Sequence, residues 1–420
     1  MLPEPMDMDH IAASNVTAAS ATRRWLMLIV VSIGAFLPMT TWFSATAIAP
    51  QLTRLWDLSP AQGAWITGAV QIGFAIGALA SSMAGLPDVF SLRKLIGVSA
   101  LTAAAANLCL LFAPSVGLML VARFVTGLAL AGVYPPAVKL VSTWFSRGRG
   151  KALGVLLAAL TLGSAFPHLV SARVDELAWQ SVILATSVAA LIGALLILWL
   201  GEEGPHPFAR SAFDPRHIKA LVRNRALMLA NLGYLGHMWE LYAMWGWMLA
   251  YIRAGGPGLG IGDPGAASFL AFFVVASGGI GSIAGGIMAD RIGRTATAAA
   301  MMVVSGFCAL TIGLTFAGPF WLFAIVAIVW GATVIGDSAQ FSAMATELSD
   351  QRYVGTALSL QLSCGIALTF CSIHLVSFMA ETIGWRWSFL VLAPGPLLGV
   401  VAMIALRRMP SARPIAHGLR

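Results

Sequence analysis

The chain of 420 residues is much more apolar than a soluble protein of that length. Hydrophobic residues make up 59% of it and charged residues only 10%, with a mean hydropathy of +0.85. A soluble domain carries about a quarter charged residues. The composition therefore excludes a globule with a water-facing surface and predicts that lipid surrounds most of the chain.

Long apolar segments recur along the whole sequence. Crossing the hydrocarbon layer takes about 20 mostly apolar residues in a helix, and backbone groups in lipid must be bonded within their own segment. Twelve segments meet this length, and we expect an all-α membrane protein with spans at 25–49, 64–84, 95–113, 115–137, 152–170, 180–200, 226–251, 267–288, 297–317, 320–344, 354–378 and 387–406.

A polar stretch between the sixth and seventh spans divides the chain into two six-helix bundles. It contains Glu202, Glu203 and Asp214, and Asp214-Pro215 predicts the start of a short amphipathic helix. The expected organisation is a tail at 1–24, bundles at 25–200 and 226–406, a central loop at 201–225, and a second tail at 407–420.

The basic residues predict the orientation in the membrane. With the N-terminus inside, only Arg54, Arg173, Arg253 and Arg386 fall on outer loops, as the excess of Lys and Arg on cytoplasmic loops requires. Both termini are thus expected to be cytoplasmic, in a bacterial inner membrane. This distribution also accounts for the net charge of +8, and it does not favour nucleic-acid binding.

Catalytic and metal-binding patterns do not occur in the sequence. The four cysteines all lie within expected spans, where buried thiols are more common than metal clusters. No HExxH or GxSxG pattern and no phosphate-binding loop is present. We therefore expect no catalytic residue, no metal and no cofactor, and the protein is not expected to be an enzyme. We also expect it to be a monomer.

The two halves repeat one another. After the second span the chain reads AGLPDVFSLRK, with Asp88, and after the eighth it reads GIMADRIGR, with Asp290. Gly127 and Gly132 in the fourth span correspond to Gly331 and Gly336 in the tenth. Parallel six-helix halves are typical of alternating-access transporters, whose solute site lies between the halves.

With these motifs the chain resembles the major facilitator superfamily over about residues 25–406. The segment 286–294 matches the superfamily's motif between the second and third helices of each half, and 88–94 is a degenerate copy. Arg123, followed four residues later by Gly127, matches a second element in the fourth helix. The resemblance implies a transporter but does not specify the solute.

The resemblance also implies a gate on the cytoplasmic side. Asp88 would face the start of the eleventh helix near Gly355, and Asp290 the start of the fifth near Lys151, since an acid is stabilised at a helix N-terminus. The gate motif would consist of Asp88, Arg93, Asp290, Arg291, Gly293 and Arg294. In the alternative interpretation these arginines only fix the orientation.

Ionisable residues within the spans are the candidates for function, because each costs about 2.5 kcal/mol or more at the bilayer centre. Glu240 lies near the middle of the seventh span, and His237 lies one helical turn before it on the same face. These two residues, together with Arg123 and Asp337, are our candidates for proton coupling or solute binding. In the alternative, Glu240 is a permanent structural partner of His237 or of another helix.

Aromatic and amide side chains complete the expected cavity. Trp42, Tyr242, Trp247 and Gln340 are the candidates for its wall, since solute pockets are apolar with a few polar groups. We expect a secondary transporter of a small organic solute that works by alternating access with proton coupling. A proton-independent facilitator and a solute-sensing receptor on the same fold are the alternatives.

Overall fold

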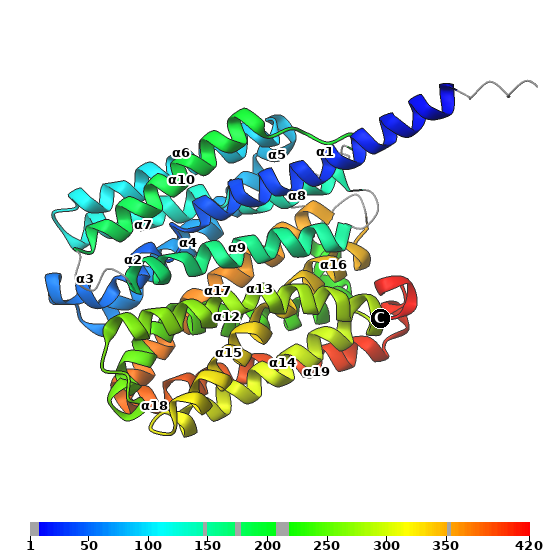
Figure 1. Ribbon diagram of the computed structural model, residues 1–420. Helices are drawn as coiled ribbons and strands as arrows, with labels where there is room; N and C mark the ends of the chain where they lie inside the picture. The colour runs from blue at the N-terminus through cyan, green and yellow to red at the C-terminus, as the bar shows by residue number, and fades with distance from the viewer. Residues whose placement is uncertain (1–7, 146–148, 173–177, 207–217, 351–353) are drawn as a thin grey trace, which may run out of the picture.

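A computed structural model describes residues 8–145, 149–172, 178–206, 218–350 and 354–420, and these form helices without a β-strand (Figure 1). Eleven spans of the described part are long and apolar enough to cross a membrane. The helix α12 (Arg225–Leu259) runs beside them and completes the twelve, its hydropathy lowered by Asn231, His237 and Glu240. The predicted all-α membrane fold is confirmed.

Six spans form the N-terminal half of the molecule. They are α1 (Met8–Met39) with α2 (Ser44–Ala47), α4 (Pro60–Met83), α6 (Leu92–Leu108), α7 (Val116–Leu130) with α8 (Tyr134–Trp144), α9 (Arg149–Ala172) and α10 (Gln180–Leu200). Short connecting helices are α3 (Ala49–Trp56) and α5 (Leu86–Val89). Helix α1 starts well before the expected span at Trp25.

Six further spans form the C-terminal half. They are α12, α13 (Pro264–Ile292), α14 (Arg294–Thr311), α15 (Phe320–Gly336) with α16 (Ser338–Leu348), α17 (Val354–Ile383), and α18 (Trp385–Ser388) with α19 (Pro394–Arg408). Between the halves, α11 (Ile218–Arg223) is described with Leu221 buried. Asp214 and Pro215, the expected start of that helix, lie outside the described residues.

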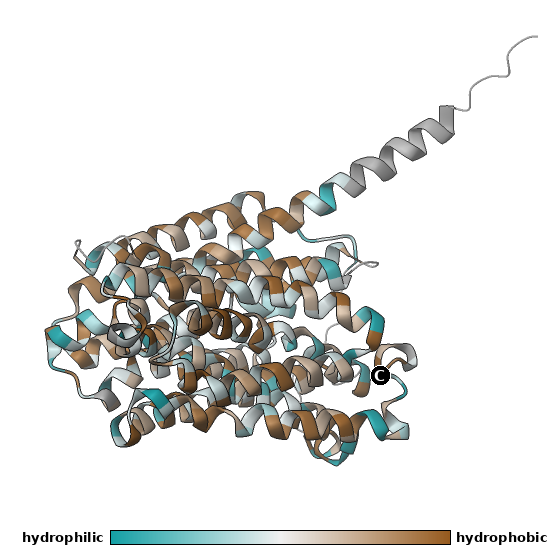
Figure 2. Cartoon of the chain, turned by 60° about the horizontal axis from the view of Figure 1, so that its bottom comes forward, coloured by the Kyte–Doolittle hydropathy of each residue, from teal (hydrophilic) through white to brown (hydrophobic). Residues whose placement is uncertain are grey.

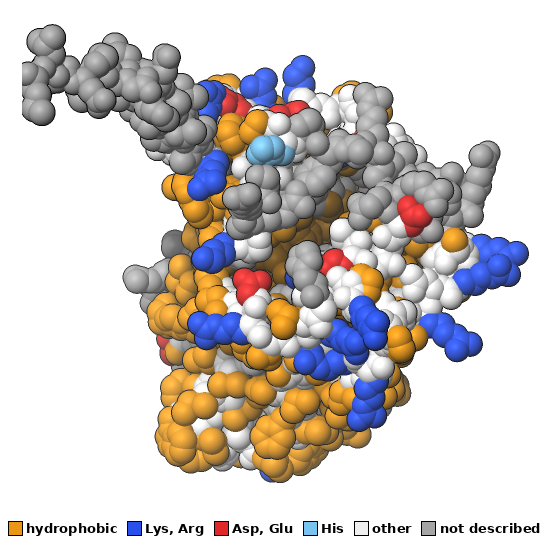
Figure 3. All heavy atoms as spheres, turned by 90° about the vertical axis from the view of Figure 1, so that its right-hand side faces the viewer, with side chains coloured by type: hydrophobic (Ala, Val, Ile, Leu, Met, Phe, Trp, Pro, Cys, Tyr) orange, Lys and Arg blue, Asp and Glu red, His pale blue; other side chains and the backbone are white. Residues whose placement is uncertain are grey.

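The start of α1 and the C-terminus lie at the same end of the bundle, where Lys and Arg side chains gather on the face shown in Figure 3. We call this the basic end and the other the opposite end. Hydrophobic residues run along the helices, and hydrophilic ones concentrate toward the two ends (Figure 2). This is the pattern expected of a bundle that crosses a hydrocarbon layer.

Close helix packing through glycine occurs in matching places in the two halves. A Cβ atom on Gly127 of α7 would collide with the backbone of Val70 in α4. A Cβ on Gly281 of α13 would likewise collide with the backbone of Ala332 in α15. The glycines therefore let these backbones approach closely, between corresponding helices of the two halves.

Three spans that reach the pocket region are interrupted within the bundle. The first span breaks between α1 and α2, the fourth between α7 and α8, and the tenth at Asp337 between α15 and α16. Non-helical backbone at membrane depth is stable only where protein buries it or it lines a cavity. These breaks therefore mark the part of the fold where polar groups meet.

Candidate functional site

A pocket lies between the two halves, among the interrupted spans. Helices α1, α8 and α9 contribute one side, and α12, α15, α16 and α17 contribute the other. Its lining residues are Met39, Tyr134, Leu157, Leu160, Thr161, Ser164, Tyr234, Met238, Leu241, Tyr242, Trp245, Ile335, Ser338, Leu362 and Ile366. Because both halves line this cavity, a change in their relative orientation would alter the access of a solute to it.

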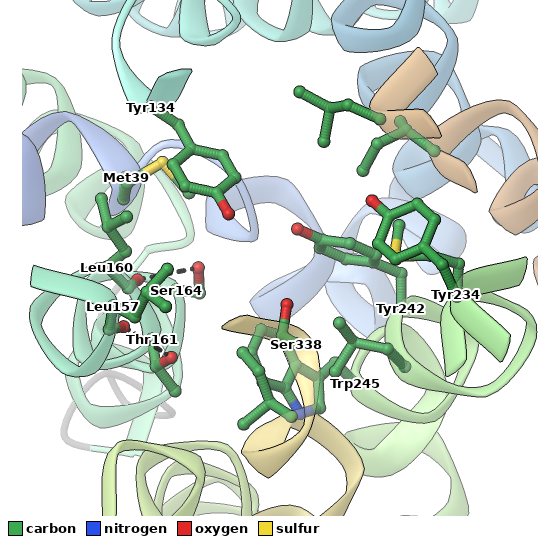
Figure 4. Close-up of a pocket in the computed structure, with 15 residues that line it drawn as sticks. Met39, Tyr134, Leu157, Leu160, Thr161, Ser164, Tyr234, Tyr242, Trp245 and Ser338 are labelled. Atoms are coloured by element: carbon green, nitrogen blue, oxygen red, sulfur yellow. Dashed lines mark hydrogen bonds between the residues drawn. The ribbon is translucent and has the colours of Figure 1, made fainter. Parts of the chain in front are cut away.

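Three of the chain's five tyrosines line this pocket. Tyr134, from α8, points its hydroxyl group across the pocket toward Tyr234 and Tyr242, both on α12 (Figure 4). Within the described part of the chain, none of the three hydroxyls has a hydrogen-bond partner. Hydroxyls that converge on a pocket without partners are available to bind a solute.

A layer of aromatic rings joins the halves at the wall of the pocket. Trp42 of the N-terminal half stacks on Tyr242, with ring centroids 5.2 Å apart, and its ring also contacts Phe74 at 4.9 Å. Phe43 lies edge-on to Trp245, 6.2 Å away. Of the two expected aromatic cavity residues here, Tyr242 reaches the pocket, whereas Trp42 lies behind it and is fully buried.

Trp247 faces away from the pocket. Its indole N–H donates to the carbonyl of Ile373 at 2.8 Å, and its ring packs against Trp385. Of the expected cavity residues, Gln340 is also not in the wall: its amide lies 3.5 Å from the carbonyl of Gly285, near Arg294. Both residues thus support helix packing around the site.

Arg123 is fully buried in the N-terminal half. Its guanidinium donates to the carbonyl of Thr41 at 2.8 Å, to that of Ile66 at 3.2 Å, and to the carbonyl of Trp42. A further bond at 3.2 Å reaches the Ser44 hydroxyl. Arg123 therefore binds two carbonyls at the break between α1 and α2 and one carbonyl of α4, and no acid pairs with it in the described part.

Glu240 is buried inside the C-terminal half. Its carboxylate accepts a hydrogen bond of 2.6 Å from the indole of Trp330 in α15 and one of 2.8 Å from the hydroxyl of Ser305 in α14. Neither its side chain nor that of His237 lines the pocket. Glu240 thus links three helices of its own half, so any effect on the solute passes through those helices.

His237 and Asp337 form a second buried contact beside Glu240. The Nδ1 atom of His237 lies 2.8 Å from the Oδ1 atom of Asp337, and both side chains are 1% exposed. Asp337 sits at the break between α15 and α16, and the next residue, Ser338, lines the pocket. Sequence spacing related His237 only to Glu240, and the structure brings Asp337 of the tenth span to His237 as well.

The described contacts of the two gate residues in the N-terminal half stay within that half. The carboxylate of Asp88 lies 2.5 Å from the ammonium of Lys139 in α8. Arg93 lies at a surface hollow with Glu202 and Glu203, without a hydrogen bond to either in the described structure. Within the described residues Asp88 thus pairs with Lys139. Residues 351–353, just before the helix start near Gly355, lie outside the described part.

The gate residues of the C-terminal half divide into two groups. Asp290 and Arg291 are exposed, and Asp290 forms no ion pair within the described residues. Arg294 donates two hydrogen bonds, of 2.9 and 2.7 Å, to the two carboxylate oxygens of Glu347 in α16. Gly293 has φ +91° and lies against the carbonyls of the chain's last two residues, where a Cβ atom would collide.

No group of three or more His, Cys, Asp or Glu side chains able to hold a metal ion occurs in the described part of the chain. The residues that line the pocket are aromatic, aliphatic or hydroxyl-bearing.

The profile of the Major Facilitator Superfamily matches residues 31–260 and 258–418, one match for each half. The chain belongs to the Major Facilitator Superfamily. Solved members share its fold. A bacterial homologue of the human lysosomal transporter Spinster, inward-facing and occupied, has a TM-score of 0.68 at 14% identity and covers 92% of this chain and 97% of its own.

The nucleoside transporter NupG, solved as a point mutant, gives the same TM-score of 0.68 at 13% identity, covering 90% of this chain and 99% of its own. Among curated superfamily relatives, the niacin transporter NiaP of Acinetobacter baylyi is 30% identical over 195 residues. That match covers 46% of this chain and 44% of NiaP, so the chain spans less than half of that relative.

Two further relatives from the superfamily match over more of the chain. The 4-hydroxybenzoate transporter PcaK of Pseudomonas aeruginosa is 24% identical, and the match covers 92% of each protein. A gallate transporter of Pseudomonas putida is 23% identical over 70% of this chain and 72% of its own. The named relatives are transporters and not enzymes.

Several residues of this superfamily member were not singled out from its sequence. Tyr134 and Tyr234 line the pocket, while Lys139 and Glu347 pair with gate residues. The concentration of three of five tyrosines in central spans was a usable signal for the first two. The ion-pair partners could not be found from spacing alone, because each lies on a different helix.

Proposed function

We propose that this protein is a secondary transporter that moves a small planar aromatic solute across the membrane by alternating access. The observation that carries the proposal is the tyrosine-lined pocket between two repeated halves. Niacin, 4-hydroxybenzoate and gallate are the solutes named for three relatives. Each of them carries a carboxyl group on a single aromatic ring. Tyr134, Tyr234, Tyr242 and Trp245 supply rings against which such a solute can pack.

The orientation follows from charge. We place the basic end in the cytoplasm, because Lys and Arg concentrate on cytoplasmic loops, and we place both termini there, in a bacterial plasma membrane. The stack of Trp42 on Tyr242 lies on the side of the pocket toward the opposite end, where α1 gives way to α2 and α3. In this proposal the described state is closed toward the outside, and rocking of the halves opens that layer.

Proton coupling is assigned to the buried cluster of Glu240, His237 and Asp337. The three groups lie in a part of the C-terminal half from which lipid is excluded, and such ionisable residues are functional candidates by default. Glu240 connects α12 to α14 and α15 through its two hydrogen bonds. Binding or release of a proton there changes the bonds between helices that also carry Tyr242 and Ser338 to the pocket.

A transport assay tests the proposal. The purified full-length protein in proteoliposomes is given radiolabelled 4-hydroxybenzoate, nicotinate and the corresponding amides, with and without an imposed pH gradient. We expect at least one solute to accumulate several-fold above its equilibrium level only when the gradient is present. Equal uptake with and without the gradient would instead identify a proton-independent facilitator.

The matched variants are Glu240→Gln and Glu381→Gln. Glutamine keeps the size of Glu240 and one acceptor for the Trp330 indole, but it cannot ionise. Glu381 is exposed at the end of α17. We expect Glu240→Gln to keep solute exchange and lose gradient-driven accumulation, while Glu381→Gln keeps both. Full accumulation by Glu240→Gln would exclude Glu240 as the proton carrier.

A further inference from the structure

The polar side-chain atoms of the pocket lining are hydroxyls and the indole N–H of Trp245, which has no hydrogen-bond partner in the described structure. The hydroxyls of Thr161 and Ser164 are bonded to carbonyls within α9. Besides the three tyrosine hydroxyls, Ser338 contributes one that has no hydrogen-bond partner in the described structure. A hydroxyl both donates and accepts, so four such groups can bind a carbonyl, an amide or another hydroxyl. They cannot neutralise a charge.

Charged side chains are missing from the pocket wall as described, whose residues are aromatic, aliphatic or hydroxyl-bearing. The buried charges of the core are already bonded elsewhere. Arg123 donates to the carbonyls of the first span, and Glu240 accepts from Trp330 and Ser305. A carboxylate in the pocket would therefore be a desolvated charge without a counter-charge, which is costly.

We propose that the pocket selects the uncharged form of its aromatic solute and binds the polar group through the hydroxyls of Tyr134, Tyr234 and Tyr242. This inference rests on the proposed transport function and specifies the solute class. The hydroxyls come from both halves, since Tyr134 lies on α8 and the other two on α12 (Figure 4). A solute that bridges them contacts both halves at once, as a site that controls their rocking must.

The first test compares solutes that differ only in charge. Isothermal titration calorimetry on the purified full-length protein at about pH 7.5, where the acids are ionised, measures nicotinamide against nicotinate, and 4-hydroxybenzamide against 4-hydroxybenzoate. We expect each amide to bind at least tenfold more tightly than its acid. Acids that bind as tightly as the amides, or no binding of any of the four, would overturn the inference.

The second test removes single hydroxyls. Tyr134→Phe and Tyr234→Phe each delete one hydroxyl and keep the ring. Each is expected to weaken amide binding by about tenfold, since one hydrogen bond contributes about 1 kcal/mol and more when its partner is left unpaired. The control is Tyr251→Phe, because the Tyr251 hydroxyl donates to the carbonyl of Arg386 and lies outside the pocket. It should change the affinity less than twofold.

Thermal unfolding of each variant without solute shows whether the variant is folded. The comparison of amide and acid uses the unmodified protein and therefore does not depend on any variant. Unchanged amide binding by both pocket variants would place the solute elsewhere. Such a result is separate from the proposed function, because accumulation driven by a pH gradient is measured independently and would stand. Conversely, a protein that binds the amides selectively but shows no gradient-driven accumulation would contradict the proposed function and leave the inference about the pocket standing.

Discussion

Trp42 in the N-terminal half stacks on Tyr242 in the C-terminal half, with ring centroids 5.2 Å apart and ring planes 16° apart. Phe43 of the N-terminal half also stacks on Tyr242, with ring centroids 6.3 Å apart, and Tyr242 lines the pocket. A stacked aromatic pair contributes about 0.5–1.5 kcal/mol beyond its buried area. The stack is therefore strong enough to bias which end of the pocket is open, yet weak enough to break in each cycle.

The substitution Trp42→Ala should open the pocket toward the opposite end. Ser164 lines the pocket, and Ser164→Cys in a background without the native cysteines reports access. We expect a membrane-impermeant maleimide to label it several-fold faster in right-side-out vesicles when Trp42 is Ala. Trp247→Ala is the control, because Trp247 packs on Trp385 within its own half. Equal labelling rates for both variants would show that the stack of Trp42 on Tyr242 does not close the pocket toward the opposite end.

The substitution Arg123→Lys should destabilise the protein without acting on the solute directly. The guanidinium bonds two carbonyls and a hydroxyl at the break in the first span and one carbonyl of α4, and lysine cannot reproduce that planar fork. Losing two such bonds costs about 3 kcal/mol or more. Thermal unfolding in detergent measures the loss, with Arg54→Lys on the surface as control. An unchanged unfolding temperature would contradict a structural role.

Asp337 and His237 should be energetically coupled. Because their Oδ1 and Nδ1 atoms lie 2.8 Å apart in a buried setting, the effects of Asp337→Asn and His237→Gln on stability should not add. A double-mutant cycle on denaturant unfolding is expected to give an interaction energy of about 0.5–3 kcal/mol. The same cycle for Asp337→Asn with the distant Glu381→Gln should give a value close to zero. If the effects of Asp337→Asn and His237→Gln add, the two residues are not energetically coupled.

Glu347 should hold the C-terminal tail in place. Its carboxylate accepts from Arg294 and also, at 3.2 Å, from the backbone N–H of Ala416. The Arg294 and Glu347 side chains are partly exposed, so Glu347→Gln should cost less than about 1 kcal/mol of overall stability. Hydrogen–deuterium exchange of residues 409–420 should nevertheless quicken several-fold, and Glu381→Gln should leave it unchanged. A tail that exchanges at the native rate would be held by other contacts.

The sequence predicted the helices and the repeat because both depend on local pattern and length. Spans such as α13 and α15 read as apolar segments, and Gly331 and Gly336 recur at the positions of Gly127 and Gly132 in the first half. The break at Asp337 and the partners of Arg123 could not be predicted, since they depend on which carbonyls a distant helix leaves unbonded.

The face of α12 that lines the pocket could not be predicted from the sequence. His237 and Glu240 were placed together on one face, and in the structure they face the interior of their own half. The pocket face consists of Tyr234, Met238, Leu241, Tyr242 and Trp245. Because protein buries α12 nearly all round, helical spacing defines its faces and cannot say which of them meets the other half.

The most direct measurement of alternating access uses two serine pairs that join the halves at their two ends. The hydroxyls of Ser171 and Ser268 lie 3.4 Å apart at the opposite end, and those of Ser82 and Ser359 lie 2.5 Å apart at the basic end. Cysteines at each pair, in a background without the native cysteines, are close enough for a disulfide. Uptake of the solute that binds most tightly is then followed in proteoliposomes before and after reduction.

Rocking of the halves predicts that a disulfide at either end stops uptake and that reduction restores it in both cases. Uptake that continues at its full rate with both ends cross-linked would contradict transport by movement of the two halves around the tyrosine pocket.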